Sequence, residues 1–284
     1  MNRRTQAVRI GLARGWTEFR LSLRSPQDQA FYLVMATAVV LYLWFNRGSE
    51  VEGTSLLLPQ VAMPSLLGGL VMFSAIIGPA AALSVERQDG TLLRSKLVPH
   101  GMLGYVSGQV LLQSVSVVPL LTVVLVPSFV LFDGLMHRGI EGWLTLLWVV
   151  GLGLLATLPF GIVIGSLVPG PEKLGTWGML PIMVLSAISG IFVPVQQLWG
   201  WVQPIAQAFP MYWLGLGMRS AFLPESAAAI EIGGSWRPLA TVSVLVAWGI
   251  AGMLVAPPVL RRMARRQSGA RVAEGRDQAL QMIR

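Results

Sequence analysis

The sequence predicts an all-α integral membrane protein with six transmembrane helices, and two observations support this fold class. The first is composition: 54% of the 284 residues are hydrophobic and only 12% are charged, whereas soluble domains have about 25% charged residues. The second is pattern, because the charges cluster at the chain ends and between long apolar runs. Such a chain is expected to be solvated largely by lipid. It contains no cysteine, which excludes disulfides and Cys-based metal sites.

Six apolar runs approach or exceed the length of about 20 residues that a transmembrane helix requires. None of their cores contains Asp, Glu, Lys, Arg or His. The third run contains Pro119 and Pro127, so we expect it to be kinked or tilted. The predicted spans are residues 30–45, 61–84, 102–132, 142–168, 174–195 and 238–260.

Basic residues predict the orientation, because loops on the cytoplasmic side of a membrane carry an excess of Lys and Arg. With both termini in the cytoplasm, 17 of the 21 basic residues lie inside. This placement accounts for the net charge of +8, so we expect no nucleic-acid partner. The first thirty residues carry six Arg and lack the apolar core of a cleavable signal peptide. We expect a multi-pass protein of the bacterial plasma membrane, inserted by its first span, with both termini cytoplasmic.

Residues 198–223 are apolar enough to suggest a seventh span, but they include Gln203, Pro204, Gln207 and Arg219. A seventh crossing would also place the Arg-rich tail outside, against the charge rule. We therefore expect re-entrant or interfacial short helices on the external side, between spans five and six. Protein or water would satisfy their free backbone groups. A true seventh span is the alternative.

The N-terminal segment has the pattern of an amphipathic helix. Its apolar stripe consists of Val8, Leu12, Trp16, Phe19 and Leu23, with Arg residues beside or opposite it. We expect this helix, within residues 1–26, to lie in the cytoplasmic headgroup plane. The alternative is packing on a soluble partner. Residues 27–260 then form the transmembrane domain, and residues 261–284 a basic cytoplasmic tail.

Several kinds of chemistry are excluded by the residues that are missing. A P-loop requires Gly-Lys followed by Ser or Thr, and both lysines, Lys96 and Lys173, lack this context. His100 and His137 are predicted on opposite sides of the membrane, so they cannot share a metal or catalytic site. Ion-coupled carriers usually hold ionisable residues at membrane depth, which these spans lack. We therefore expect a non-catalytic chain without metal or cofactor, and any energy that drives its activity would come from outside the chain.

The loop after the second span, residues 86–99, has a recognisable local pattern. Gly90 permits a tight turn, Thr91 can cap a following short helix, and Pro99 can end it before the third span. This pattern predicts a short helix that projects into the cytoplasm. An ordinary solvated loop is the alternative.

Two segments resemble the ABC-2-type export permeases. The first is this loop, which matches the family's acidic-Arg…Gly-Thr-Leu…Pro signature at the first coupling helix. The second is the stretch from Ser189 to Arg219, which is similar to the family's Ser-Gly-x-Phe-x-Pro, Trp and Asn-Pro-x-Tyr…Arg pattern. One departure is Phe209, which stands where Asn is usual before Pro210. Within the family, the sequence resembles the permeases of daunorubicin- and doxorubicin-resistance exporters.

The resemblance implies roles for three groups of residues. It assigns contact with the ATPase to Glu86, Arg87, Gly90, Thr91, Leu92, Lys96 and Pro99, with a smaller contact at Glu172 and Lys173. It assigns the external re-entrant region to Pro194, Trp201, Pro204, Pro210, Tyr212 and Arg219. Glu225 and Glu231 are the two candidate partners of Arg219. It implies a substrate path along spans two and five, for which the candidates are Met72, Phe73, Ile76, Met179, Met183 and Phe192; packing against lipid or neighbouring helices is the alternative for each.

The function implied is that of an efflux permease, conferring drug or antibiotic resistance, which exports an amphipathic drug or lipid. The resemblance implies that its partners are two copies of an ABC ATPase, which bind ATP and Mg, and a second permease chain, identical or different. One rival is export of a lipid-linked polysaccharide by the same architecture. Others are a non-transporting membrane scaffold or immunity protein, and an ion-coupled carrier.

Overall fold

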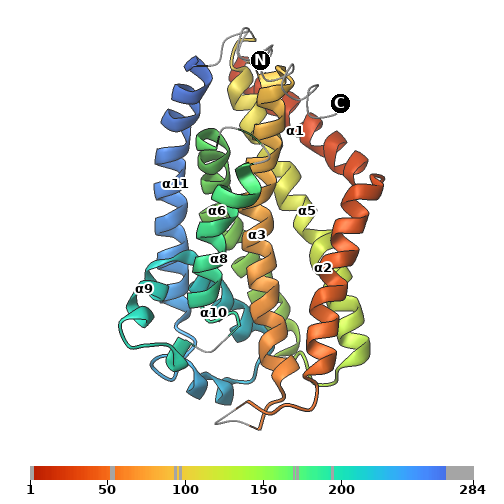
Figure 1. The fold of residues 1–284 in the computed structure, drawn as a ribbon, viewed down its shortest axis with the longest axis vertical. Helices are drawn as coiled ribbons and strands as arrows, with labels where there is room; N and C mark the ends of the chain where they lie inside the picture. Colours follow the sequence, from red (N-terminus) through yellow and green to blue (C-terminus); the bar gives the residue numbers. More distant parts are fainter. Residues whose placement is uncertain are drawn as a thin grey trace.

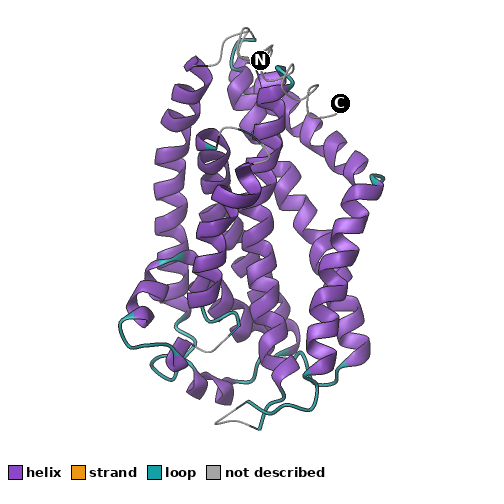
Figure 2. Ribbon diagram, viewed as in Figure 1, coloured by secondary structure: helices purple, strands orange, loops and turns teal. Residues whose placement is uncertain are grey.

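The described part of the chain consists of helices joined by loops. The computed structural model describes residues 3–51, 55–92, 95, 98–168, 170, 173–192 and 195–266, and Figure 2 shows no strand among them. The long helices are α1 (Arg3–Ser22), α2 (Pro26–Phe45), α3 (Leu58–Gln88), α5 (Gly101–Leu131), α6 (Gly139–Leu167) and α11 (Pro238–Arg266). The shorter ones are η1 (Leu174–Gly178), α8 (Met179–Ile188), η2 (Val195–Gln197), α9 (Val202–Ala208), α10 (Pro210–Phe222) and η3 (Glu225–Ile230).

Five of these helices, α2, α3, α5, α6 and α11, are long and apolar enough to cross a membrane. They coincide with five of the six predicted spans and run side by side along the long axis of the molecule (Figure 1). α2 and α5 run in one direction, and α3, α6 and α11 run in the other. The N-terminal helix, the end of α3, the start of α5 and the end of α11 therefore lie at one end, which we call the α1 end.

The remaining predicted span, residues 174–195, is shorter in the structure than expected. A π-helical turn leads into α8, and the apolar helix ends at Ile188. Gly190 then has a φ of 80°, a left-handed conformation that commonly follows a helix C-terminus. A helix over Leu174–Ile188 is about 22 Å long at 1.5 Å per residue, which is less than the roughly 30 Å hydrocarbon core.

Glycines allow the helices to approach closely, as is common where membrane helices pack. A Cβ atom added to Gly161 of α6 would lie 2.5 Å from the Ile76 carbonyl oxygen of α3. One added to Gly165 would lie 2.8 Å from the Cα of Ala80. The two helices therefore touch through their backbones, and the small residues fix their spacing.

The N-terminal helix forms as predicted, but a different face of it is buried. It packs along α5 through Gly11 and Gly15, where any added Cβ would overlap the carbonyl oxygens of Gly104 and Gly108. Of the predicted apolar stripe, Phe19 is buried, whereas Trp16 is 48% exposed. Backbone contact through glycine therefore determines which face meets the bundle, and part of the stripe is left free.

A short break separates α1 from α2. Ser25 caps α2, its Oγ accepting a hydrogen bond from the Asp28 amide at 3.3 Å, and Pro26 occupies the first turn of the helix. Pro26 therefore marks the start of α2 after the break.

Candidate functional site

The α3–α5 loop begins with the tight turn that the sequence predicts. Gly90 has a φ of 74°, and a helical turn follows in which Ser95 Oγ donates to the Thr91 carbonyl at 3.3 Å. Leu92 is fully buried against Leu83 of α3 and Tyr105 of α5. The loop is therefore packed onto the bundle at its start.

The loop ends as expected too. Pro99 is exposed and precedes His100, whose φ is 59°, and α5 then starts at Gly101. Lys96, assigned to the same contact, lies outside the described residues.

Glu86 connects the end of α3 to the N-terminal helix. Its Oε1 accepts a hydrogen bond from Arg14 Nη2 at 2.7 Å, and the same arginine donates to Glu18 at 2.6 Å. The Arg14 guanidinium also lies 5.8 Å from the ring centre of Tyr105. Burial lowers the pKa of Arg14, but the hydrogen bonds and charges of Glu18 and Glu86 outweigh it, so the pKa is raised and Arg14 stays charged. Glu86 is thus in contact with α1 rather than free in solvent.

Arg87 connects α3 to the end of α6. Its Nη1 donates to the carbonyl oxygens of Gly165 at 3.1 Å and Val168 at 2.8 Å. The last carbonyls of a helix lack intrahelical partners and carry partial negative charge, so a guanidinium stabilises them. Glu86 and Arg87 together link three helices where α3 enters the loop.

The second predicted ATPase contact is only partly described. Lys173 is exposed and immediately precedes η1. Glu172 lies outside the described residues.

At the opposite end, α9 and α10 form a hairpin that enters the bundle and returns to the same end. The Ala208 carbonyl at its turn accepts a hydrogen bond from Trp248 Nε1 at 2.8 Å. Trp248 lies ten residues into α11, about 15 Å from the start of that helix. At the far end of α10, the Phe222 carbonyl accepts from the His137 amide in the α5–α6 loop at 2.9 Å.

The residues at the hairpin turn explain its shape. Phe209 is extended, Pro210 occupies the first turn of α10, and Phe209 stacks on Trp248 with ring centres 5.7 Å apart. An aromatic contact therefore occupies the position where the family usually has Asn. Pro204 lies within the short α9, Trp201 is exposed and stacked on Trp199, and Pro194 is outside the described residues.

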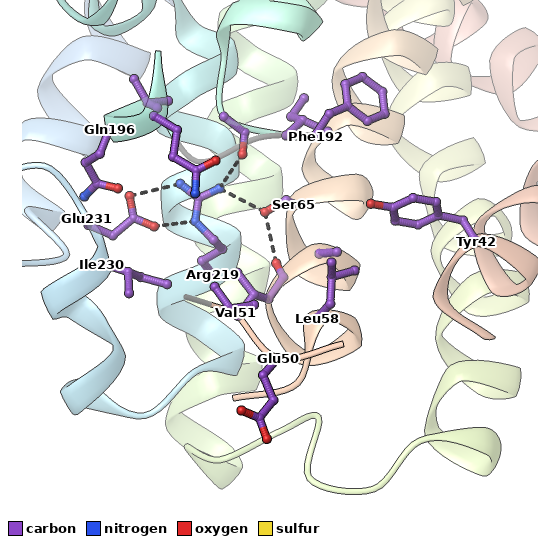
Figure 3. A pocket seen from close by; sticks show the side chains of 16 residues that line it. Tyr42, Glu50, Val51, Leu58, Ser65, Phe192, Gln196, Arg219, Ile230 and Glu231 are labelled. Carbon is purple, nitrogen blue, oxygen red and sulfur yellow. Dashed lines mark hydrogen bonds and ion pairs between the residues drawn. The ribbon is translucent and has the colours of Figure 1, made fainter. Parts of the chain in front are cut away.

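Every residue of α10 is buried, including Arg219, which is only 4% exposed. Arg219 forms a two-pronged ion pair with Glu231, with Nε–Oε1 and Nη2–Oε2 distances of 2.5 and 3.1 Å. Its Nη1 donates to Ser65 Oγ at 2.9 Å and to the Gly190 carbonyl at 3.4 Å. Figure 3 shows these contacts converging on one guanidinium. Of the two carboxylates considered from the sequence, Glu231 is the partner, while Glu225 pairs with Arg138.

A second arginine holds the start of α10. Arg237 donates to Gln207 Oε1 at 2.9 Å and to the hydroxyl of Tyr212 at 2.5 Å, and it lies 4.9 Å from the ring centre of Trp213. Arg237 is not among the site residues predicted from the sequence. Its position directly before Pro238, at the start of the last span, was the available signal.

A cavity of about 260 Å³ lies beside the Arg219–Glu231 pair. Its lining comes from α2, α3, the segment after α8, α10 and the end of η3 (Figure 3). It brings together Tyr42, Ser65, Phe192 and the ion pair, which are far apart in the sequence.

The six candidate residues for a substrate path do not line one surface. Met72 and Ile76 are buried in the core, and Phe73 packs against it. Met179 is half-buried, while Met183 and Phe192 are 66% and 60% exposed. Of the six, only Phe192 lines the cavity beside Arg219.

Comparison with known proteins identifies the family. The family model of the ABC-2 type transporter matches residues 12–223, which extend from α1 to the end of α10. No curated protein matches the chain. With most of its length covered by one family model, the chain belongs to the ABC-2 type transporter family.

Proposed function

We propose that this chain is the membrane-spanning subunit of an exporter that moves an amphipathic compound out of the cell, driven by ATP hydrolysis on a separate ABC ATPase. Membership of the ABC-2 family and the long apolar helices support a transport permease. The sequence has no phosphate-binding loop, which supports placing hydrolysis on a partner. Two ATPase copies and a second permease chain would complete the transporter.

The observation that carries this proposal is the way in which the α3–α5 loop joins the bundle. Glu86 contacts α1, Arg87 contacts the end of α6, and Leu92 packs against α3 and α5. A partner that pushes on this loop therefore acts on four helices at once. Closely packed helices pass on such a displacement because their interiors resist compression.

The α9–α10 hairpin would close the path on the external side. The hairpin starts and ends at the end of the bundle opposite to the α3–α5 loop, which we call the coupling loop. Its helix α10 is buried between α3, α6 and α11. In a membrane it would be re-entrant, its backbone groups shielded by the surrounding helices. The ion pair of Arg219 with Glu231 and the hydrogen bonds of Arg237 to Gln207 and Tyr212 would then hold the hairpin in place.

Site-specific cross-linking tests the ATPase contact, and the cysteine-free chain makes it simple. Val98, which is 59% exposed in the loop, would be replaced by Cys and labelled with a photoreactive maleimide. Ser235→Cys, exposed at the opposite end, is the matched control. We expect a cross-link to the ABC ATPase in the assembled complex from Val98→Cys only. Equal cross-linking from both positions, or none from Val98→Cys in an assembled complex, would contradict the proposed contact.

A further inference from the structure

We infer that the cavity beside Arg219 and Glu231 binds a cationic amphipathic compound through a hydrogen-bond-donating head group. The inference rests on the proposed export function and names the substrate class that the external end of the permease accepts. Three independent features of the cavity support it: the hydrogen-bonding capacity of the ion pair, the charge of the lining residues and the aromatic side of the cavity.

The hydrogen-bonding capacity left over at the ion pair is mostly that of an acceptor. Arg219 has five N–H donors, and four of them are used by Glu231, Ser65 and the Gly190 carbonyl. The Ser65 hydroxyl hydrogen is also used, by the Val61 carbonyl at 3.1 Å. Each oxygen of Glu231 accepts one bond from Arg219, whereas a carboxylate can accept about four bonds. A ligand group that donates hydrogen bonds, such as an ammonium or hydroxyl group, can therefore bind the free acceptor positions of Glu231. An anion, which only accepts hydrogen bonds, cannot use them.

The charge of the cavity points to the same class of ligand. Among the described residues that line it, the charged ones are Glu50, Arg219 and Glu231. Glu231 neutralises Arg219, so Glu50 carries the uncompensated charge. Its carboxylate lies at the rim and points away from Arg219 (Figure 3). A concave site with excess negative charge attracts cations and repels anions.

The other side of the cavity is aromatic. The rings of Phe192 and Tyr42 lie across from Glu231, and the Tyr42 hydroxyl points toward Ser65 (Figure 3). Phe192 is 60% exposed and lines the cavity, so its ring is accessible to a ligand. An amphipathic cation would place its head near Glu231 and its apolar body against these rings. Aromatic faces also attract cations directly.

Two fluorescent probes of matched shape test the inference. Dansylcadaverine ends in a primary ammonium group, and N-dansyl-6-aminohexanoate ends in a carboxylate. Binding of each to the purified chain in lipid nanodiscs would be measured by dansyl fluorescence, with empty nanodiscs subtracted. We expect the ammonium probe to bind about tenfold more tightly, the effect of about one hydrogen bond to a charged group. This binding assay contains no ATPase or ATP, so it tests the cavity independently of transport. A chain that binds the ammonium probe but does not support export would contradict the proposed function and leave the inference about the cavity intact.

Variants at exposed positions assign the binding to this cavity without disturbing the buried ion pair. Phe192→Ala should weaken binding of the ammonium probe about threefold through lost apolar contact. Glu50→Gln should reduce the preference for the ammonium probe by a similar factor. The matched controls are Phe45→Ala, 80% exposed on α2, and Glu141→Gln, exposed at the start of α6; neither lines the cavity. Equal affinity for the two probes, or binding unchanged in both cavity variants, would overturn the inference.

Discussion

Arg14 of the N-terminal helix and Glu86 at the end of α3 form an ion pair with an Nη2–Oε1 distance of 2.7 Å, across 72 residues of sequence. The Glu86 side chain is only 14% exposed, and that of Arg14 is 34% exposed. Pairs that are partly shielded from water are stronger than those on the surface. The pair therefore joins α1 to the helix that leads into the proposed coupling loop.

The first prediction concerns this pair. Glu86→Ala removes a hydrogen bond between charged groups, worth about 1.5–3 kcal/mol, and should reduce export several-fold while the protein still inserts. Glu18→Ala is the matched control, because it removes an i,i+4 pair with the same arginine worth only about 0.2–0.5 kcal/mol. Export from cells and the amount of protein in the membrane would be measured together. The exchanged double variant Arg14→Glu/Glu86→Arg should regain part of the lost export, and equal defects in Glu86→Ala and Glu18→Ala would contradict a role for the pair.

The second prediction concerns the packing of α1 on α5. Gly11→Ala places a methyl group against the Gly104 carbonyl, and overpacking of this kind costs about 1–3 kcal/mol. The midpoint of thermal unfolding in detergent should fall. Gly151→Ala in α6 is the control, since an added Cβ there has no atom within 4 Å, and replacing a helical glycine stabilises by about 0.5–1 kcal/mol. A Gly11→Ala variant as stable as Gly151→Ala would mean that α1 is not held against α5.

The third prediction concerns the buried pair of Arg219 and Glu231. Arg219→Ala leaves a buried carboxylate without its partner, at a cost of about 3–5 kcal/mol. We expect loss of monodisperse protein in size-exclusion chromatography after mild heating. Arg219→Lys should restore only part of the stability, because lysine cannot form the two-pronged contact.

The control for this third prediction is Arg138→Ala. Its pairs with Glu141 and Glu225 are exposed and 3.5 and 3.4 Å long, so the cost should be about 0–1 kcal/mol. Similar stability of Arg138→Ala and Arg219→Ala would show that the buried pair contributes little to holding α10.

The fourth prediction concerns orientation. With both termini in the cytoplasm, a Cys at position 284 should not react with a membrane-impermeant maleimide in intact cells. Ser235→Cys, exposed at the opposite end of the bundle, should react. Labelling after cell lysis shows that both thiols are accessible. Labelling at position 284 in intact cells would reverse the predicted topology.

Five of the predicted spans could be located from the sequence because apolar runs of this length leave few other structures possible. The end of the fifth predicted span, residues 174–195, was misjudged: the apolar run continues past Ile188, but the helix ends there and Gly190 turns the chain. Apolar composition does not record where a glycine adopts a positive φ. The same limit applies to α1. Its stripe of large apolar residues predicted the buried face, whereas the contact with α5 is made by Gly11 and Gly15.

The candidate site was partly predictable for a similar reason. The turn at Gly90 has a local signature, and Arg219 is conspicuous as a charge among aromatic residues. The partners of Glu86 and Arg87 are 72 and about 80 residues away in sequence, so only the folded bundle reveals them. Met72 and Ile76 could not be told from core residues, because lipid, a substrate path and a helix interface all favour apolar side chains.

The most direct test of the account measures export and ATP hydrolysis side by side in the reconstituted complex with Gly90→Pro. Proline fixes φ near −65°, whereas Gly90 has a φ of 74°, so the turn that starts the coupling loop cannot form. The apolar helices are unchanged, and the complex should still insert and assemble. We predict that substrate no longer stimulates hydrolysis and that export is lost, while basal hydrolysis by the ATPase continues. Full export and full stimulation by Gly90→Pro would contradict the claim that this loop couples the ATPase to the transport path.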